Sequence, residues 1–406
     1  MTGGTGFARG FSPRLPALLR EERLLWPLAY GALLGVTFLL RGKLSGNLAL
    51  VCFILPVLLQ AGAERAALAA ARPVAHTAAF LAGVGLWAVL SCVANRVPFG
   101  ATVEAATSLL LLVLFLGFVH GLVRRVPFRR VLLVLAGFAA LNALLSMLVH
   151  VAQQGWVFSR LIPLGRPGNP IPAAGGIAIG LVALLALAAD RPRPSPRAWA
   201  LAGLALAAML AALVWTQSRG PIIAFGAAVA AMAVLARTTA RPAPVLAACL
   251  LAWAVVTGAI LLEGSVRGHL CALSQGLCRP SLRGEVWAWV WETVRTRPLL
   301  GTSPAFRFPD QMLNHPHNGV FGTAMFYGPL LLAAGLVALA LLLRRLPRLA
   351  PPQRAFVVGG LVFAFGYMGS DLSNPFAFFN MHYLFLWLPV FCLASLPEAE
   401  TAARVP

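Results

Sequence analysis

Two histidines, His315 and His317, flank Pro316 at the point where a polar stretch gives way to a long apolar run. A histidine side chain has an unperturbed pKa of about 6.5, so it can accept a proton at neutral pH. A positioned general base of this kind typically contributes about 10²–10⁴-fold to a reaction rate. The pair therefore predicts proton transfer at a boundary between loop and apolar segment, although a single histidine more often serves only packing.

Three arginines beside turns or helix starts predict a binding site for an anion. They are Arg166 in GRPGNP, Arg219 in WTQSRGP and Arg283 in SLRGE. A single arginine at the end of a span usually extends to lipid headgroups, but a guanidinium also binds phosphate oxygens in a bidentate manner. The acids expected on the same side of the membrane are few: Glu104, Glu263, Glu285, Glu292, Asp310 and Asp371. Arginines of this kind would stabilise a departing pyrophosphate while His317 accepts a proton.

Polar residues next to these motifs are further candidates for binding a substrate that carries such a pyrophosphate. They are Asn169, Ser218, His315, Asn318 and Asp371. Asp371, in the turn SDLSNP, has three interpretations: it orients His317, it pairs with an arginine, or it is a solvated turn acid.

Several common catalytic motifs are absent from the sequence. It contains no Walker A loop, no G-x-S-x-G and no HExxH, and no DxD or paired aspartates among the segments expected on the arginine-rich side. A metal-bound nucleotide-sugar mechanism would need such carboxylates. We therefore expect chemistry without a metal or cofactor, on a donor that is already activated.

The segments that position these residues are those of a polytopic membrane protein. Of the 406 residues 60% are hydrophobic and only 11% are charged, with a mean hydropathy of +0.83. One span needs about 20 apolar residues. Apolar stretches between polar or proline-rich breaks predict about twelve spans, near residues 25–40, 47–61, 75–94, 101–122, 131–151, 173–189, 198–214, 220–236, 243–262, 319–343, 355–370 and 379–395.

The net charge of +20 reflects membrane orientation rather than a nucleic-acid partner. Most of the 32 basic residues fall in short connections on one side of the predicted spans, which is the positive-inside pattern. This predicts that both termini are cytoplasmic and that the candidate site faces the opposite side. No cleavable signal peptide is expected, since the first apolar stretch is followed by further spans.

The chain is predicted to be a single membrane domain, residues 1–406, with one long outer loop at residues 263–317. A loop of that length is usually functional or disordered. Within it, residues 283–298 have helical periodicity, with Trp287, Val290, Trp291 and Val294 on one face. Such an amphipathic helix suits the lipid interface and is equally compatible with packing on the membrane domain.

The six cysteines divide into two groups. Two lie in the outer loop, Cys271 and Cys278, where an oxidising compartment would allow a disulfide. Too few other ligands lie nearby for a closed zinc site. The remaining four fall inside predicted spans as small hydrophobic residues: Cys52, Cys92, Cys249 and Cys392.

These motifs resemble those of the bacterial O-antigen ligases, within the O-antigen ligase and polymerase superfamily. The ligase motif H-[NSQ]-x9-G-x-x-[GTY] is matched by His317-Asn318, nine residues and then Gly328, whereas Leu331 departs from the last position. The SRGP at 218–221, Arg283 and the Pro-x-x-Gly at 298–301 are similar to further family motifs. The resemblance covers roughly residues 160–335.

The resemblance implies an all-α fold of the lipid-dependent (GT-C-like) glycosyltransferase type in the bacterial inner membrane, with a periplasmic active site. The implied donor is undecaprenyl-pyrophosphate-linked O-antigen, and the acceptor is a sugar hydroxyl of the lipid A–core oligosaccharide. Arg219 and Arg283 would bind the pyrophosphate, with Arg166 as a third. His317 would act as general base or orient the hydroxyl, and His315 would assist or pack. Direct attack would invert the anomeric configuration.

Other functions share part of this evidence. An O-antigen polymerase uses the same chemistry with a growing glycan as acceptor, and an O-linked oligosaccharyltransferase glycosylates protein. A transporter of lipid-linked glycans would be expected to carry polar residues along a path across the membrane, whereas the predicted spans are nearly free of charge. A purely structural membrane protein is a further alternative.

Overall fold

The computed structural model describes residues 22–60, 71–155, 159–189, 195–234, 242–262, 283–308 and 315–398. These residues form helices and no strands, which confirms the all-α membrane class. The candidate disulfide residues Cys271 and Cys278 lie outside the described residues. The four cysteines within the described ranges are free and lie in helices, as expected: Cys52, Cys92, Cys249 and Cys392.

The helices follow the apolar stretches of the sequence. In chain order they are α2 (Glu22–Leu39), α3 (Gly42–Leu59), α5 (Arg72–Ala94), α6 (Phe99–Arg125), α7 (Phe128–Gln154), α8 (Pro170–Ala188), α9 (Pro196–Trp215), α10 (Arg219–Val234), α11 (Pro242–Leu261), α13 (Arg283–Thr296), α14 (Gly319–Tyr327), α15 (Pro329–Leu343), the short η2 (Leu346–Arg348), α16 (Pro351–Met368), the π-helical η3 (Tyr383–Trp387) and α17 (Leu388–Ser395).

Seven helical segments among the described residues are long and apolar enough to cross a membrane. They are α5 to α9, α11 and the segment Pro329–Arg348. Four shorter apolar helical segments lie at Leu24–Leu39, Leu44–Leu59, Arg219–Val234 and Tyr383–Ser395. The membrane class is therefore established, and the number of twelve spans stays a prediction.

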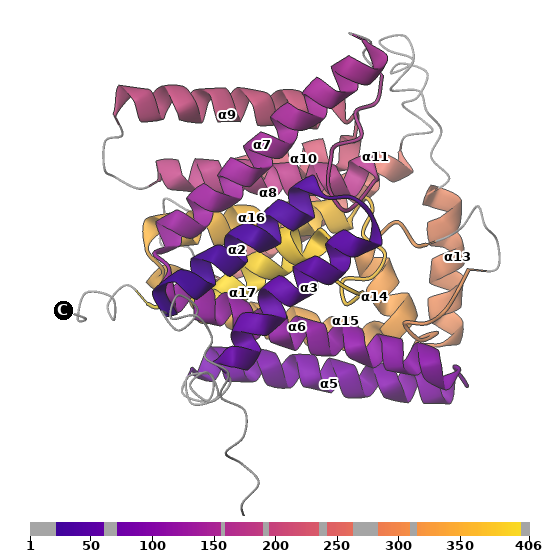
Figure 1. Ribbon diagram of the computed structural model, residues 1–406. Helices are drawn as coiled ribbons and strands as arrows, with labels where there is room; N and C mark the ends of the chain where they lie inside the picture. Colours follow the sequence, from indigo (N-terminus) through magenta and orange to yellow (C-terminus); the bar gives the residue numbers. More distant parts are fainter. Residues whose placement is uncertain are drawn as a thin grey trace, which may run out of the picture.

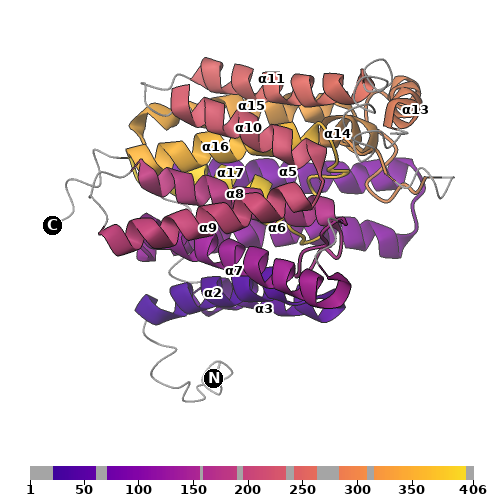
Figure 2. The ribbon, with the colours of Figure 1, turned by 90° about the horizontal axis from the view of Figure 1, so that it is seen from above.

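Most helices run along one common direction, while α13 lies across their ends (Figure 1, Figure 2). Both views place α14 beside α13 at that end of the bundle. A helix lying across the ends of spanning helices is suited to the surface of a bilayer. The connections gathered around α13 and α14 carry most of the residues singled out from the sequence.

Helix α16 forms the centre of the bundle. Every residue from Ala355 to Met368 is buried, and α16 packs against α8, α10, α11 and α17. Small residues allow this close approach: a Cβ at Gly366 would lie 2.8 Å from the Cβ of Ala224 on α10. Close packing through glycine and alanine is a common way for membrane helices to associate. Helix α16 thereby fixes the position of the turn that follows it.

The predicted span at residues 319–343 is interrupted, which corrects the sequence-based boundary. Helix α14 ends at Tyr327, Gly328 adopts a φ of +85°, and α15 begins at Pro329. A Cβ at Gly328 would overlap the carbonyl of Leu299, so the preceding loop can approach only because this residue is glycine. The backbone NH of Thr302 then donates to the carbonyl of Met325 at 2.7 Å, near the end of α14.

The outer-loop helix predicted from residues 283–298 is present as α13. Its buried face consists of Val286, Trp287, Val290 and Val294. Trp291, which the periodicity had placed on that face, is instead 58% exposed. The sequence predicted the helix correctly but misplaced one edge of its apolar face.

Candidate functional site

A hydrogen-bonded pair of His317 and Asp371 forms the centre of the candidate site. His317 Nδ1 lies 3.1 Å from Asp371 Oδ1. The side chains are 27% and 11% exposed, respectively. A carboxylate can only accept, so Nδ1 donates to it, and in the neutral form of the ring Nε2 then has a lone pair. This arrangement equips Nε2 to accept a proton from a hydroxyl.

The backbone around His317 explains how the histidine is presented. His317 has a φ of +51°, in the left-handed region that residues other than glycine rarely adopt. The next residue, Asn318, is the N-cap of α14, and its side-chain oxygen accepts from the backbone NH groups of Val320 and Phe321 at 3.1 Å each. A strained residue that is held in place by its neighbours is typical of functional sites. The cap therefore fixes the orientation of His317 relative to the start of α14.

Asn318 serves structure in this arrangement. It is fully buried, and its side-chain oxygen also lies 3.4 Å from the indole nitrogen of Trp253. Its side-chain nitrogen is 3.5 Å from the hydroxyl oxygen of Thr257 on α11. We therefore assign Asn318 to helix capping and loop positioning rather than to substrate contact.

The turn after α16 brings Asp371 to His317 across 54 residues of sequence. The hydroxyl of Tyr367, one turn earlier on α16, donates to Asp371 Oδ2 at 3.3 Å. Helix α14 packs closely on the same turn, because a Cβ at Gly322 would overlap the carbonyl of Ser373. The carboxylate is thus held by two donors from two different segments.

The charge state of Asp371 follows from its surroundings. Burial acts to raise the pKa of this carboxyl group, but the hydrogen bond from His317 and nearby positive charge outweigh that effect, so its pKa lies below the ordinary value. The sources of this charge are Arg283 and, in their protonated forms, His315 and His317. Asp371 is therefore ionised at neutral pH and can orient and stabilise a protonated His317.

The His315 ring lies against the His317 ring at an interplanar angle of 39° but is suited to a different role. The two ring centroids are 3.5 Å apart, and His315 Nδ1 accepts from the backbone NH of His317 at 3.2 Å. Burial, followed by the charge of His317, lowers the pKa of His315 to about 4. His315 is therefore neutral at physiological pH and supports the loop.

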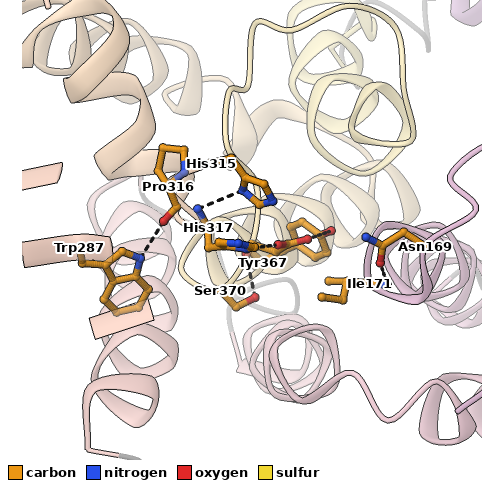
Figure 3. A network of polar contacts seen from close by, with 9 residues as sticks. Asn169, Ile171, Trp287, His315, Pro316, His317, Tyr367 and Ser370 are labelled. Carbon is orange, nitrogen blue, oxygen red and sulfur yellow. Dashed lines mark hydrogen bonds and ion pairs between the residues drawn. The ribbon is translucent and has the colours of Figure 1, made fainter. Parts of the chain in front are cut away.

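Helix α13 connects Arg283 to this network. The indole NH of Trp287 donates to the carbonyl of Pro316 at 2.9 Å, as the dashed line in Figure 3 shows. The Trp287 ring also meets Phe321 of α14 edge to face, at 5.8 Å between centroids. Arg283 lies one turn before Trp287 and is near enough to affect the pKa of both His315 and Asp371. Arg283 is thus the first residue of the helix whose Trp287 holds the histidine loop.

The start of α10, where Arg219 lies, approaches the same turn. Arg219 is the first residue of α10, after the buried Ser218. A Cβ at Gly220 would overlap the hydroxyl of Ser370, so the start of α10 lies directly against the turn that carries Asp371. Arg160 approaches here too, with its Nη2 at 3.5 Å from the Ser218 hydroxyl oxygen. Helix α10 therefore directs its positively polarised N-terminus to this turn.

The remaining predicted residues, Arg166 and Asn169, lie close together in the loop before α8. Arg166 is half-buried; its Nη2 donates to the carbonyl of Phe379 at 2.7 Å, and its guanidinium lies 5.4 Å from the centre of the Phe379 ring. Asn169 is the N-cap of α8, where its side-chain oxygen accepts from Ile171. Figure 3 shows Asn169 at the end of α8 on the opposite side of the network from Trp287. The structure gives both residues local roles and joins neither to the His317–Asp371 pair by a hydrogen bond.

Sequence reasoning missed Tyr367 and the specific role of Trp287. A tyrosine within an apolar helix carries no motif, and only its position one turn before Asp371 signals the contact. The tryptophan density of α13 was visible, but which indole would bind the histidine loop was not. The Trp287 contact joins segments that are 29 residues apart, whereas the Tyr367 contact is local in sequence.

The cluster also has the composition of a potential metal site. His315, His317 and Asp371 each offer a ligand atom, and these atoms lie within 4.8 Å of one another. Two of the nitrogens are engaged in hydrogen bonds, since His317 Nδ1 contacts Asp371 and His315 Nδ1 accepts from a backbone NH. The hydrogen bond of 3.1 Å between His317 and Asp371 is by itself the arrangement of an acid–base pair.

No family model, no curated protein and no solved structure matches this chain. The features of the chain that indicate a function are therefore the geometry around His317 and the motifs of the sequence.

Proposed function

We propose that this protein is a membrane glycosyltransferase of the O-antigen ligase type. It would transfer a glycan from undecaprenyl pyrophosphate to a sugar hydroxyl of a lipid A–core acceptor, on the periplasmic side of a bacterial inner membrane. The observation that carries the proposal is the His317–Asp371 pair at 3.1 Å, beside Arg283 and the start of α10. The resemblance of the HN-x9-G and SRGP motifs to the ligase family supports the same assignment.

The proposed reaction divides the work between the pair and the arginines. The acceptor hydroxyl gives its proton to His317 Nε2 as its oxygen attacks the anomeric carbon of the donor sugar. The bond from that carbon to the pyrophosphate oxygen breaks, and undecaprenyl pyrophosphate leaves with the bonding electrons. Asp371 stabilises the imidazolium, while Arg219 and Arg283 stabilise the charge of the leaving group. The product has inverted anomeric configuration.

The test is transfer by the purified protein in nanodiscs, supplied with undecaprenyl-pyrophosphate-linked glycan and lipid A–core. We expect a slower-migrating glycolipid that forms in the presence of a chelator, and loss of that product in Arg219→Ala and Arg283→Ala. A reaction that requires an added divalent cation would instead assign the His315, His317 and Asp371 cluster to a metal.

The same assay separates the alternatives. Lengthening of the donor glycan, without transfer to the core, would identify a polymerase, and transfer to an added protein would identify an oligosaccharyltransferase. If the folded protein forms none of these products, the proposal is wrong and movement of the lipid-linked glycan across a vesicle membrane becomes the activity to measure. For His317→Ala we expect lost transfer with donor binding retained.

A further inference from the structure

An apolar groove runs along the side of the bundle, between α5, α15, α16 and α17. Its volume is about 560 Å³, which is in the range of sites that bind small apolar molecules. Phe80 of α5, Gly335 and Leu339 of α15 and Trp387 of η3 contribute to its lining. In the bilayer such a groove is filled by lipid, and its ends decide which lipid fits best.

The groove runs along the N-terminal half of α5, where its lining residues fall between Arg72 and Leu81. One end of the groove is lined by Val320 and Thr323 of α14, the helix that follows His317. At the other end lie Arg72 and His76, in the first turns of α5. The groove therefore extends from α14 to the start of α5.

The lining at the far end of the groove includes two arginines. They differ in how far their side chains are already bound by other residues. Arg345 donates to the carbonyls of Leu393 and Leu396 and forms an ion pair with Glu398 at 3.6 Å, so it fastens the end of α17. Arg72 is exposed and forms no side-chain hydrogen bond or ion pair with another described residue. Arg72 can therefore bind an anion at headgroup depth.

We propose that the groove is a binding site for an anionic phospholipid, with one acyl chain along Phe80 and Gly335 and the phosphate at Arg72. The charge distribution favours this occupant over the tail of a polyprenyl pyrophosphate. A polyprenyl chain with its pyrophosphate near His317 is uncharged at its other end, whereas the far end of the groove carries cations. An arginine at that depth attracts the headgroup of an anionic lipid. The proposal is independent of the catalytic assignment.

Native mass spectrometry of the full chain, with phosphatidylglycerol or phosphatidylcholine added to the same detergent, tests this site. We expect one retained phosphatidylglycerol per chain and weaker retention of phosphatidylcholine. Arg72→Gln should weaken phosphatidylglycerol binding about fivefold, the factor that one basic residue contributes near an anionic lipid. Arg197→Gln is the matched control, because Arg197 is also exposed in the first turn of a helix, α9, and does not line the groove.

A second variant tests the acyl chain separately from the headgroup. A Cβ at Gly335 would meet only Phe80 at 3.7 Å, so Gly335→Leu fills the groove without a backbone clash and should abolish the retained lipid. Equal binding of both phospholipids, or phosphatidylglycerol binding unchanged in Arg72→Gln, would overturn the proposal. Displacement of phosphatidylglycerol by equimolar undecaprenyl phosphate would also overturn it, since the groove would then bind the polyprenyl tail.

Discussion

Replacement of Asp371 by asparagine tests the acid–base pair most directly. The substitution keeps the volume of the side chain and removes its charge. A hydrogen bond to a charged group contributes about 1.5–3 kcal/mol, and each 1.36 kcal/mol corresponds to about tenfold in rate. The carboxylate accepts from His317 and Tyr367 at 3.1 and 3.3 Å, and only the first bond strengthens when the imidazole gains a proton. We therefore expect kcat to fall about 10- to 150-fold, with little change in KM for the donor.

The assay is steady-state glycan transfer, accompanied by a measurement of Tm that excludes unfolding as the cause. A double-mutant cycle with His317→Gln supplies the control, because residues that act as a unit are not additive. We expect Asp371→Asn to have almost no effect once His317 is replaced. Full activity of Asp371→Asn, or two losses that multiply in the double variant, would refute the pairing as the basis of catalysis.

Three further substitutions test the support around the pair. Trp287→Phe removes the donor to the carbonyl of Pro316, so we expect a loss of about 1–3 kcal/mol in the free energy of unfolding and reduced kcat; unchanged transfer would show that α13 does not position the loop. Burial lowers the pKa of His315 from 6.5 to about 4, so the contribution of the neutral ring to stability is complete above pH 6.5 and is lost as the pH falls toward 4. His315→Gln should therefore flatten the decline of Tm between pH 6.5 and pH 4. A decline of Tm equal to that of the unsubstituted protein would contradict a buried, neutral His315. Gly328→Ala places a Cβ against the Leu299 carbonyl at a φ of +85°. We expect this substitution to lower the free energy of unfolding by at least about 2 kcal/mol. An unchanged Tm would show that the loop around Leu299 can move away from residue 328 without loss of stability.

The helical class and most helix positions could be predicted from the sequence, because long apolar stretches must form helices in a membrane. The break at Gly328 was missed since α14 and α15 are both apolar and read as one stretch, although a Gly-Pro pair is a recognised signal for a turn. The structure reveals a glycine that accommodates the Leu299 carbonyl, which is a contact between segments that hydropathy cannot report.

The site was partly predictable for a related reason. His317, Arg219 and Arg283 stand in short local motifs, so the sequence singles them out as candidates, and their functional roles stay predictions. The partner of His317 was not identified, because Asp371 had three interpretations and only the packing of α14 on the turn after α16 selects the first. Asn318 was expected at the substrate and instead caps α14, a role that its position before an apolar helix also permitted.

The separation of His317 and Asp371 by 54 residues has a consequence for biosynthesis. A chain emerging from the ribosome carries His317 into the membrane well before Asp371 has been made. During that interval the histidine lacks its carboxylate, and the turn against which α14 packs does not yet exist. The His317–Asp371 pair can therefore form only when almost the whole chain has been made, and any activity that depends on the pair would begin only then.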